Sequence, residues 1–162
     1  MTTRSQFQVI LKYHFHTTSQ LLNCAFQLGQ EQFDHDPGYS RGSLHQIFFH
    51  IMRADHNFRR ELESGKRIPP LIRLEEFPDL DSLRAGFSKE QALWEALLDG
   101  LSDEQLEGTI RLTNLDGEEK DLPYYRILQH VILHGMQHHS EIAALLTQFG
   151  HSPGNIDFIF FN

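Results

Sequence analysis

The chain has 162 residues, of which 40% are hydrophobic, and its formal net charge at pH 7 is −8. This length and apolar content suit one globular domain over residues 1–162 with its own core. The negative charge argues against a nucleic-acid backbone or an anionic membrane as the main partner. The sequence shows no signal-peptide pattern at its start and no apolar run long enough for a membrane span, so we expect a soluble cytoplasmic protein.

Helical periodicity dominates the first part of the chain. Apolar residues recur at three- and four-residue intervals from about Phe7 to Glu31, which predicts a first helix. The chain has a single cysteine, Cys24, so it cannot form an intrachain disulfide. We expect the Cys24 side chain to be a small buried thiol rather than a nucleophile. The breakers in residues 34–43 predict a loop. Ser43 is a suitable N-cap for a second helix, which ends near Ser64 and Gly65.

The second half of the chain predicts two more long helices. One spans about Asp81 to Leu101, with Asp79 or Asp81 as its cap. Residues 108–123 predict either a small β-hairpin or an extended loop. The other helix runs from Pro123 to Phe149, and the apolar tail after it is expected to pack back on the body. We therefore predict an all-α fold, a four-helix bundle with a possible short β-hairpin before the last long helix.

Histidines concentrate in the last predicted helix, since five of the 11 in the chain fall between His130 and His151. His134 and His138 are four residues apart, so both project from one helix face and can reach a single divalent metal ion. Pairs of histidines four residues apart also arise by chance in a chain with this many histidines. A metal site therefore needs a third ligand from another part of the chain. His50 lies beside the apolar stripe of the second helix and is the candidate, the alternative being a hydrogen-bonded core histidine.

Three neutral imidazoles would suit Zn, Ni, Fe or Co, and three protein ligands leave open positions, as in catalytic sites. Glu141 follows His138 by three residues and is the candidate catalytic base, the alternative being an exposed carboxylate. Asp55 has the same two possible roles, a catalytic base or an exposed carboxylate. The remaining histidines are expected outside the ligand set or on the surface: His14, His16, His35, His45, His56, His130, His139 and His151. His130 lies one turn before His134, but helical drift rotates it away from His138.

The stretches "LHQIFFHIMRADHNF" and "LQHVILHGMQHHSEIAALLTQFGHSPGNIDFIFF" resemble the DinB/YfiT-like family of metal-binding four-helix-bundle proteins. The pattern of that family has a histidine and an aliphatic residue in the second helix, then an "HxxxHGxxHRGQI"-like run in the last one. The resemblance places the metal ligands at His50, His134 and His138. His139, Ser140 and Glu141 depart from the Arg, Gly and Gln of that run, so the resemblance says nothing of the polar groups around the ligands.

The resemblance also implies an activity. Relatives resemble thiol-dependent S-transferases, in which a divalent metal (Ni, Zn, Fe or Co) activates a low-molecular-weight thiol for transfer to an electrophilic small molecule. Two alternatives stay open: a metal-dependent hydrolase that uses metal-bound water with Glu141 as proton acceptor, and a non-catalytic metal-binding stress-response protein. Relatives often pair, so a homodimer is expected. Five phenylalanines could form the contact between subunits, and core packing explains them equally well: Phe48, Phe49, Phe158, Phe160 and Phe161.

Overall fold

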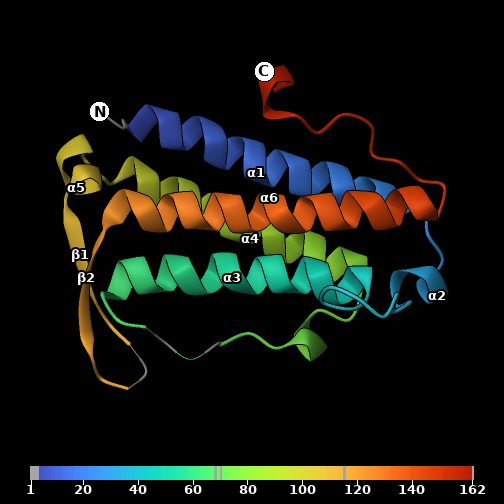
Figure 1. Cartoon of the computed structure of the whole chain (residues 1–162), viewed down its shortest axis with the longest axis horizontal. Coiled ribbons are helices and arrows are strands. Elements are labelled where there is room, and N and C mark those ends of the chain that lie inside the picture. The colour runs from blue at the N-terminus through green and yellow to red at the C-terminus, as the bar shows by residue number, and fades with distance from the viewer. Residues whose placement is uncertain (1–3, 68, 70, 115, 162) are drawn as a thin grey trace.

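Four long helices lie side by side in the computed structural model, which describes residues 4–67, 69, 71–114 and 116–161 (Figure 1). They are α1 (Arg4–Ala25), α3 (Leu44–Ser64), α4 (Leu80–Asp99) and α6 (Tyr124–Gln148). Helices α1 and α3 each pack against both α4 and α6. This arrangement confirms the predicted bundle of four helices.

The long helices begin and end where local chemistry predicts. Ser43 accepts a hydrogen bond from the backbone N–H of Gln46, and the Gln46 side chain accepts one from the N–H of Ser43, which is a capping box for α3. Gly65 ends that helix with a left-handed φ of 66°. Asp79 caps α4 through the N–H of Ser82. The predicted caps Ser43 and Asp79 are therefore confirmed.

The first predicted helix is divided in the structure. Helix α1 ends at Ala25 and a short α2 (Gln30–Phe33) follows a turn. The chain is extended at Gly29, with φ −73° and ψ 158°, and Phe33 is only 1% exposed. After the turn, α2 places the Phe33 ring in the core.

A hairpin and three shorter elements complete the chain. Strands β1 (Thr109–Thr113) and β2 (Glu119–Pro123) pair antiparallel, so the hairpin alternative is confirmed and the extended loop is wrong. Helix α5 (Asp103–Glu107) and the 3₁₀ turns η1 (Leu74–Glu76) and η2 (Phe158–Phe160) were not predicted. Each is five residues or fewer, too short for a helical period to show in the sequence.

The core fills the space between the four long helices. Trp94 lies at its centre, fully buried, and its indole N–H donates to the backbone oxygen of Asp55. The other largest side chains that are fully buried are Phe7, Leu21, Leu22, Phe33, Leu44, Ile47, Phe48, Ile51, Met52, Leu83 and Leu98. No helix among the described residues is both long and apolar enough to cross a membrane.

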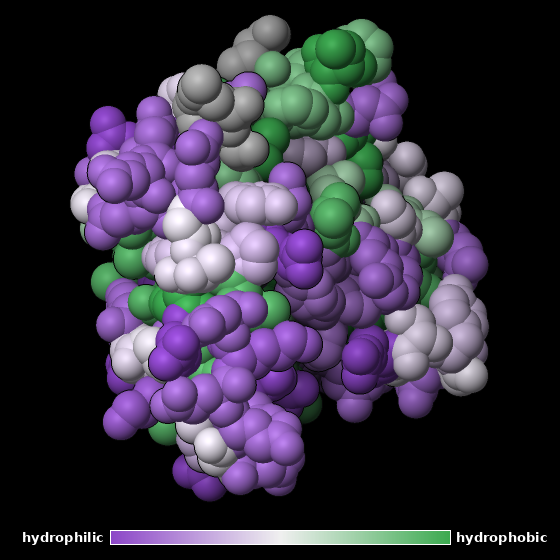
Figure 2. Space-filling model, turned by 60° about the vertical axis from the view of Figure 1, so that its left-hand side comes forward, coloured by the Kyte–Doolittle hydropathy of each residue, from purple (hydrophilic) through white to green (hydrophobic). Residues whose placement is uncertain are grey.

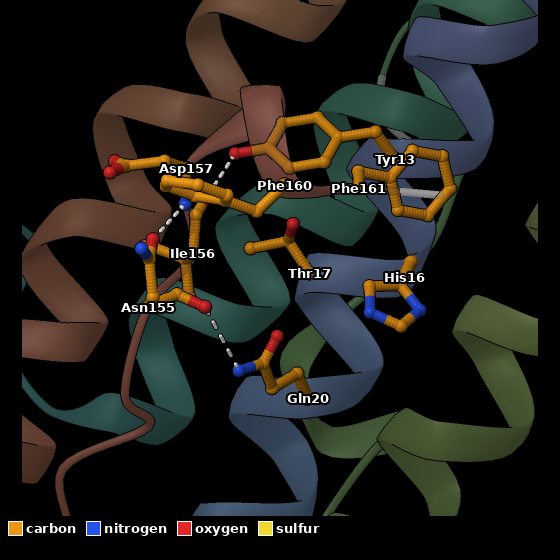
Figure 3. A pocket seen from close by; sticks show the side chains of 9 residues that line it. All are labelled: Tyr13, His16, Thr17, Gln20, Asn155, Ile156, Asp157, Phe160 and Phe161. Carbon is orange, nitrogen blue, oxygen red and sulfur yellow. Dashed lines mark hydrogen bonds between the residues drawn. The ribbon is translucent and has the colours of Figure 1, made fainter.

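The C-terminal tail lies along α1 but leaves apolar side chains exposed. Tyr13 donates a hydrogen bond to the backbone oxygen of Ile156 (Figure 3). Gln20 donates a hydrogen bond to the backbone oxygen of Pro153 at 2.8 Å. Ile159 and Phe160 nevertheless remain 81% and 67% exposed. Figure 2 shows hydrophobic side chains gathered at the top of the molecule, where this tail lies. The predicted packing therefore holds for the tail backbone and fails for these two side chains.

Candidate metal centre

Helices α3 and α6 bring together the three histidines that the sequence singles out. One ring nitrogen from each of His50, His134 and His138 lies within 4.8 Å of the other two. The ring centroids form a near-equilateral triangle with sides of 4.6, 4.7 and 4.9 Å. His134 and His138 project from successive turns of α6, and His50 reaches them from α3.

The spacing of these nitrogens fits one divalent ion. His50 Nε2 and His134 Nε2 are 3.0 Å apart. Two nitrogens that each lie about 2.1 Å from one ion, at a right angle, are separated by about 3.0 Å. Three imidazoles are a donor set that suits Zn, Ni, Fe or Co. The three histidines are therefore compatible with metal binding, and the nitrogen donors alone do not select the metal.

Glu141 fixes the orientation and tautomer of His138. Its Oε2 lies 2.7 Å from His138 Nδ1 and also accepts a hydrogen bond from Ser40 Oγ at 2.6 Å. Partial burial alone would raise the pKa of the Glu141 carboxyl, but these hydrogen bonds outweigh it and lower that pKa. An ionised carboxylate only accepts hydrogen bonds, so His138 Nδ1 carries the hydrogen, and in the neutral ring the lone pair is on Nε2, the nitrogen that can bind a metal ion.

The two other histidines are held neutral by their surroundings. Burial lowers the pKa of His50 to about 4, and the charges of Arg41 and His138 add to this effect. Burial and the neighbouring His138 and His50 likewise lower the pKa of His134 to about 4. Both imidazoles are therefore neutral at pH 7, which is the state that binds a metal ion.

A second group of polar side chains lies behind the three histidines. His14 Nε2 is 3.0 Å from Asp55 Oδ2, and both side chains are fully buried. The His14 ring also stacks on His139 at 5.1 Å, and His139 Nε2 is 2.8 Å from Thr18 Oγ1. The expectations of a surface His14 and an exposed Asp55 are wrong. One sequence signal was available, because His14 continues the buried helical spacing of Phe7, Leu11, Thr18 and Leu21.

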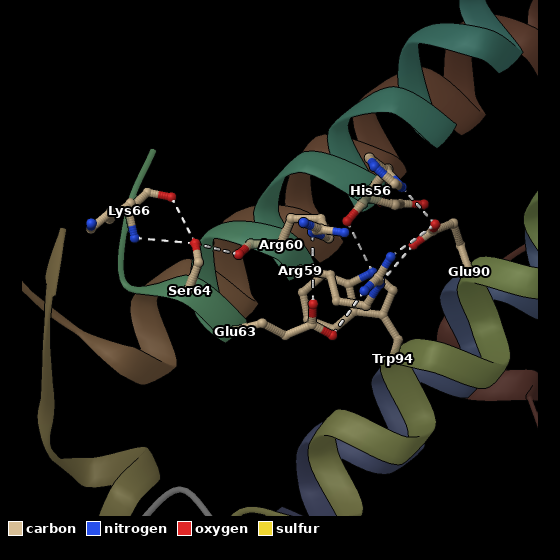
Figure 4. A network of polar contacts seen from close by, with 9 residues as sticks. His56, Arg59, Arg60, Glu63, Ser64, Lys66, Glu90 and Trp94 are labelled. Atoms are coloured by element: carbon tan, nitrogen blue, oxygen red, sulfur yellow. Dashed lines mark hydrogen bonds and ion pairs between the residues drawn. The ribbon is translucent and has the colours of Figure 1, made fainter. Parts of the chain in front are cut away.

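The remaining candidates lie away from the three histidines. His56 Nδ1 is 2.8 Å from Glu90 Oε1, and Arg59 donates to Glu90 Oε2 at 2.8 Å (Figure 4). Arg59 is 3% exposed. Cys24 is only partly buried, and burial raises the pKa of its thiol, so the thiol is less readily ionised than in solution.

Comparison with known proteins agrees with this fold. The sequence matches the model of the DinB family over residues 1–162. A DinB-like protein from Bacillus cereus ATCC 10987 has a similar structure with a TM-score of 0.71 and 19% identity, over 94% of this chain and 97% of that one. A DinB-like protein from Bacillus subtilis gives a TM-score of 0.63 and 17% identity, over 88% and 93%. No curated protein matches the chain. The chain belongs to the DinB family.

Proposed function

We propose that the chain is a divalent-metal-dependent enzyme that transfers a low-molecular-weight thiol to an electrophilic small molecule. The observation that carries this proposal is the convergence of three imidazoles, one of them oriented by an ionised carboxylate. Three protein ligands leave positions on an ion for an exogenous ligand, which is the pattern of catalytic rather than structural metal sites. The metal would be Ni, Zn, Fe or Co.

The residues of the centre have separate roles in this proposal. His50, His134 and His138 would hold the ion, which would stabilise a thiol sulfur as its thiolate at neutral pH. Glu141 keeps the hydrogen on His138 Nδ1, so the ligand nitrogen of that ring stays free. The Glu141 side chain is 27% exposed, and its carboxylate can pass the proton that the thiol loses to solvent. The sulfur then bonds to the electrophilic carbon, and the leaving group departs with the bonding electrons.

Hydrolysis is the second candidate, because Glu141 also lies where a general base for water would be needed. The hydrogen bonds that lower the Glu141 pKa make its carboxylate a weaker base, which favours the thiol reaction. A metal-binding protein without turnover is the third candidate.

A spectroscopic and kinetic comparison separates the three candidates. Cobalt(II)-substituted protein would be titrated with 3-mercaptopropionate, and turnover of an electrophilic substrate would be assayed with and without thiol. Thiol transfer predicts a new sulfur-to-cobalt absorption band and turnover only with thiol. Turnover of an activated ester without thiol would support hydrolysis, and an occupied centre with no turnover would support a binding protein.

We also propose that the chain forms a homodimer. Phe48 and Phe49 are 0% and 6% exposed and belong to the core, so they cannot form a contact between subunits. Phe158 and Phe160 are 45% and 67% exposed and remain available. Light scattering should give twice the chain mass of 18.9 kDa, and the mass of a single chain would refute the dimer.

A further inference from the structure

A cavity of about 360 Å³ lies between α3, α4 and the segment that joins them. Its volume falls in the range of about 300–1,000 Å³ that is typical of sites for small molecules. Its apolar wall is formed by residues from all three parts of the chain: Met52 from α3, Ile72 and Phe77 from the joining segment, and Ala85 and Gly86 from α4. The cavity is therefore suited to the apolar part of a small molecule.

Local contacts hold this apolar wall in place. The ring centroid of Phe77 is 6.0 Å from that of Phe49, and the backbone oxygen of Phe77 is 2.7 Å from His45 Nε2. A Cβ atom built on Gly86 would lie 2.4 Å from Met52 Sδ and 2.9 Å from Phe77 Cε1. The lack of a side chain at Gly86 thus lets both of these side chains approach α4. The wall is formed before any ligand binds, which lowers the entropic cost of binding.

The two acidic side chains that line the cavity, Glu76 and Glu90, both have cationic partners. Glu90 accepts a hydrogen bond from Arg59 Nε at 2.8 Å and lies 2.8 Å from His56 Nδ1 (Figure 4). Glu76 forms an ion pair with Arg73, in which the oxygen and nitrogen are 3.5 Å apart. The negative charge of each carboxylate is therefore balanced by a neighbouring side chain.

Lys89 brings a positive charge to the same wall. Its side chain is exposed and lines the cavity, and its ammonium group has no hydrogen bond or ion pair with the part of the chain that the structure describes. An ammonium group forms charge-assisted hydrogen bonds with a carboxylate. The cavity thus combines an apolar wall with one unpaired positive charge.

The cavity lies on a different side of α3 from the metal centre. His50 faces α6, where its Nε2 is 3.0 Å from His134 Nε2. Met52 faces α4, where its sulfur lies next to Gly86. Residues two apart on a helix point about 200° away from each other. The cavity is therefore separate from the three histidines.

We propose that this cavity is a second ligand site, which binds a small molecule with an apolar body and one carboxylate. The apolar body would lie against Met52, Phe77 and Ala85, and the carboxylate would pair with the ammonium group of Lys89. The site goes beyond the proposed thiol reaction and needs no metal ion. Neutral molecules of the same shape would bind less tightly, because they cannot form the ion pair.

Isothermal titration measures the preference for a carboxylate. The probes are 4-phenylbutyrate and 4-phenylbutyramide, which differ in charge and hardly in shape. Lys89→Gln should weaken binding of the carboxylate about two- to fivefold, as expected for an exposed ion pair, and should hardly change that of the amide. Glu76→Gln should strengthen binding of the carboxylate, because it removes a nearby negative charge. Lys120→Gln is the matched control, since Lys120 is exposed on β2 and does not line the cavity.

NMR of protein labelled at the methionine methyl groups shows where the probe binds. Met52 lines this cavity, whereas Met136 lines a different apolar cavity between α1, α6 and the C-terminal tail. 4-Phenylbutyrate should shift the methyl signal of Met52 and leave that of Met136 in place. Ala85→Phe should weaken binding of both probes, because the larger side chain would occupy part of the cavity. Ala85 and Lys89 are exposed, so their variants should fold, and circular dichroism checks this.

Several results would overturn the second ligand site. Equal binding of both probes to the wild-type protein would do so, as would an equal loss of both in Lys89→Gln, or no binding of the carboxylate. A shift of Met136 without one of Met52 would place the probe in the other cavity. Binding of the carboxylate that is lost in His138→Ala and unchanged in Lys89→Gln would place it at the metal centre instead.

Discussion

The imidazole of His14 occupies the space that a side chain at Gly135 would need. A Cβ atom built on Gly135 would lie 2.3 Å from both His14 Cε1 and His14 Nδ1. Gly135 directly follows His134 on α6, so α1 approaches α6 closely just behind the metal centre. The buried His14–Asp55 pair, at 3.0 Å, joins α1 to α3, which carries His50. The placement of the three candidate ligands thus depends on this packing of three helices.

Gly135→Ala should displace His14 or push α6 away from α1. Overpacking typically costs about 1–3 kcal/mol, against which alanine in a helix gains about 1 kcal/mol over glycine. We expect a net loss of unfolding free energy in urea and weaker metal binding. Gly100→Ala is the control, because Gly100 has a φ of −79° and its added Cβ would meet no atom closer than 3.5 Å, so it should change stability by less than about 0.5 kcal/mol. Wild-type stability in Gly135→Ala would contradict the packing account.

The His14–Asp55 pair should show strong coupling in a double-mutant cycle. His14→Leu leaves the Asp55 carboxyl buried without its partner, and loss of one member of such a pair costs about 3–5 kcal/mol. Asp55→Leu should be comparably harmful. The double variant should lose less unfolding free energy than the sum of the single variants, because it buries no unpaired ionisable group. Additive losses would show that the two side chains do not stabilise each other.

Glu141→Gln tests the proposed orientation of His138. The substitution keeps the shape of the side chain and removes the charge that fixes the hydrogen on His138 Nδ1. Loss of such a partner typically lowers metal affinity about 10- to 100-fold. Competition with a chromogenic chelator measures this affinity. Ser40→Ala, which leaves the carboxylate in place, should have a smaller effect, and an unchanged affinity in Glu141→Gln would refute the role of Glu141.

The metal-free protein should lose stability in mild acid. His50 and His134 have pKa values of about 4 in the folded chain and about 6.5 when unfolded, so the unfolded chain binds more protons between these limits. The stability contribution of both neutral rings is therefore present above about pH 6.5 and lost as pH falls towards 4. Urea unfolding at pH 7 and pH 5 measures the loss. His50→Gln should reduce it, and an identical pH dependence in this variant would contradict the assignment.

Local signals in the sequence were sufficient for the long helices and the hairpin. Ser43 and Asp79 cap helices whose apolar residues keep a strict period, and Asp116 and Gly117 provide the turn between the strands. The proximity of His134 and His138, two of the three candidate ligands, was also predictable, because a helix places residues four apart on one face. The position of His50 beside these two residues could not be predicted from helix spacing, because it depends on the packing of α3 against α6.

Contacts between distant segments decided what the sequence could not predict. His14 and Asp55 are 41 residues apart, and either side chain alone reads as a surface group. Ser40 and Glu141 are 101 residues apart, and their hydrogen bond brings the loop before α3 next to the candidate metal centre. Arg59 similarly looks solvated until Glu90 on α4 is seen to pair with it. A polar residue is buried when it finds such a partner, and the pairing is a property of the fold.

Metal content tests the central claim most directly. The protein would be expressed without a polyhistidine tag, purified without chelator and analysed by mass spectrometry beside His138→Ala. His138 is one of the three candidate ligands and its side chain is 3% exposed. The account predicts about one divalent ion per chain in the wild-type protein and none in the variant. No metal in either protein after reconstitution, or equal occupancy in both, would contradict it.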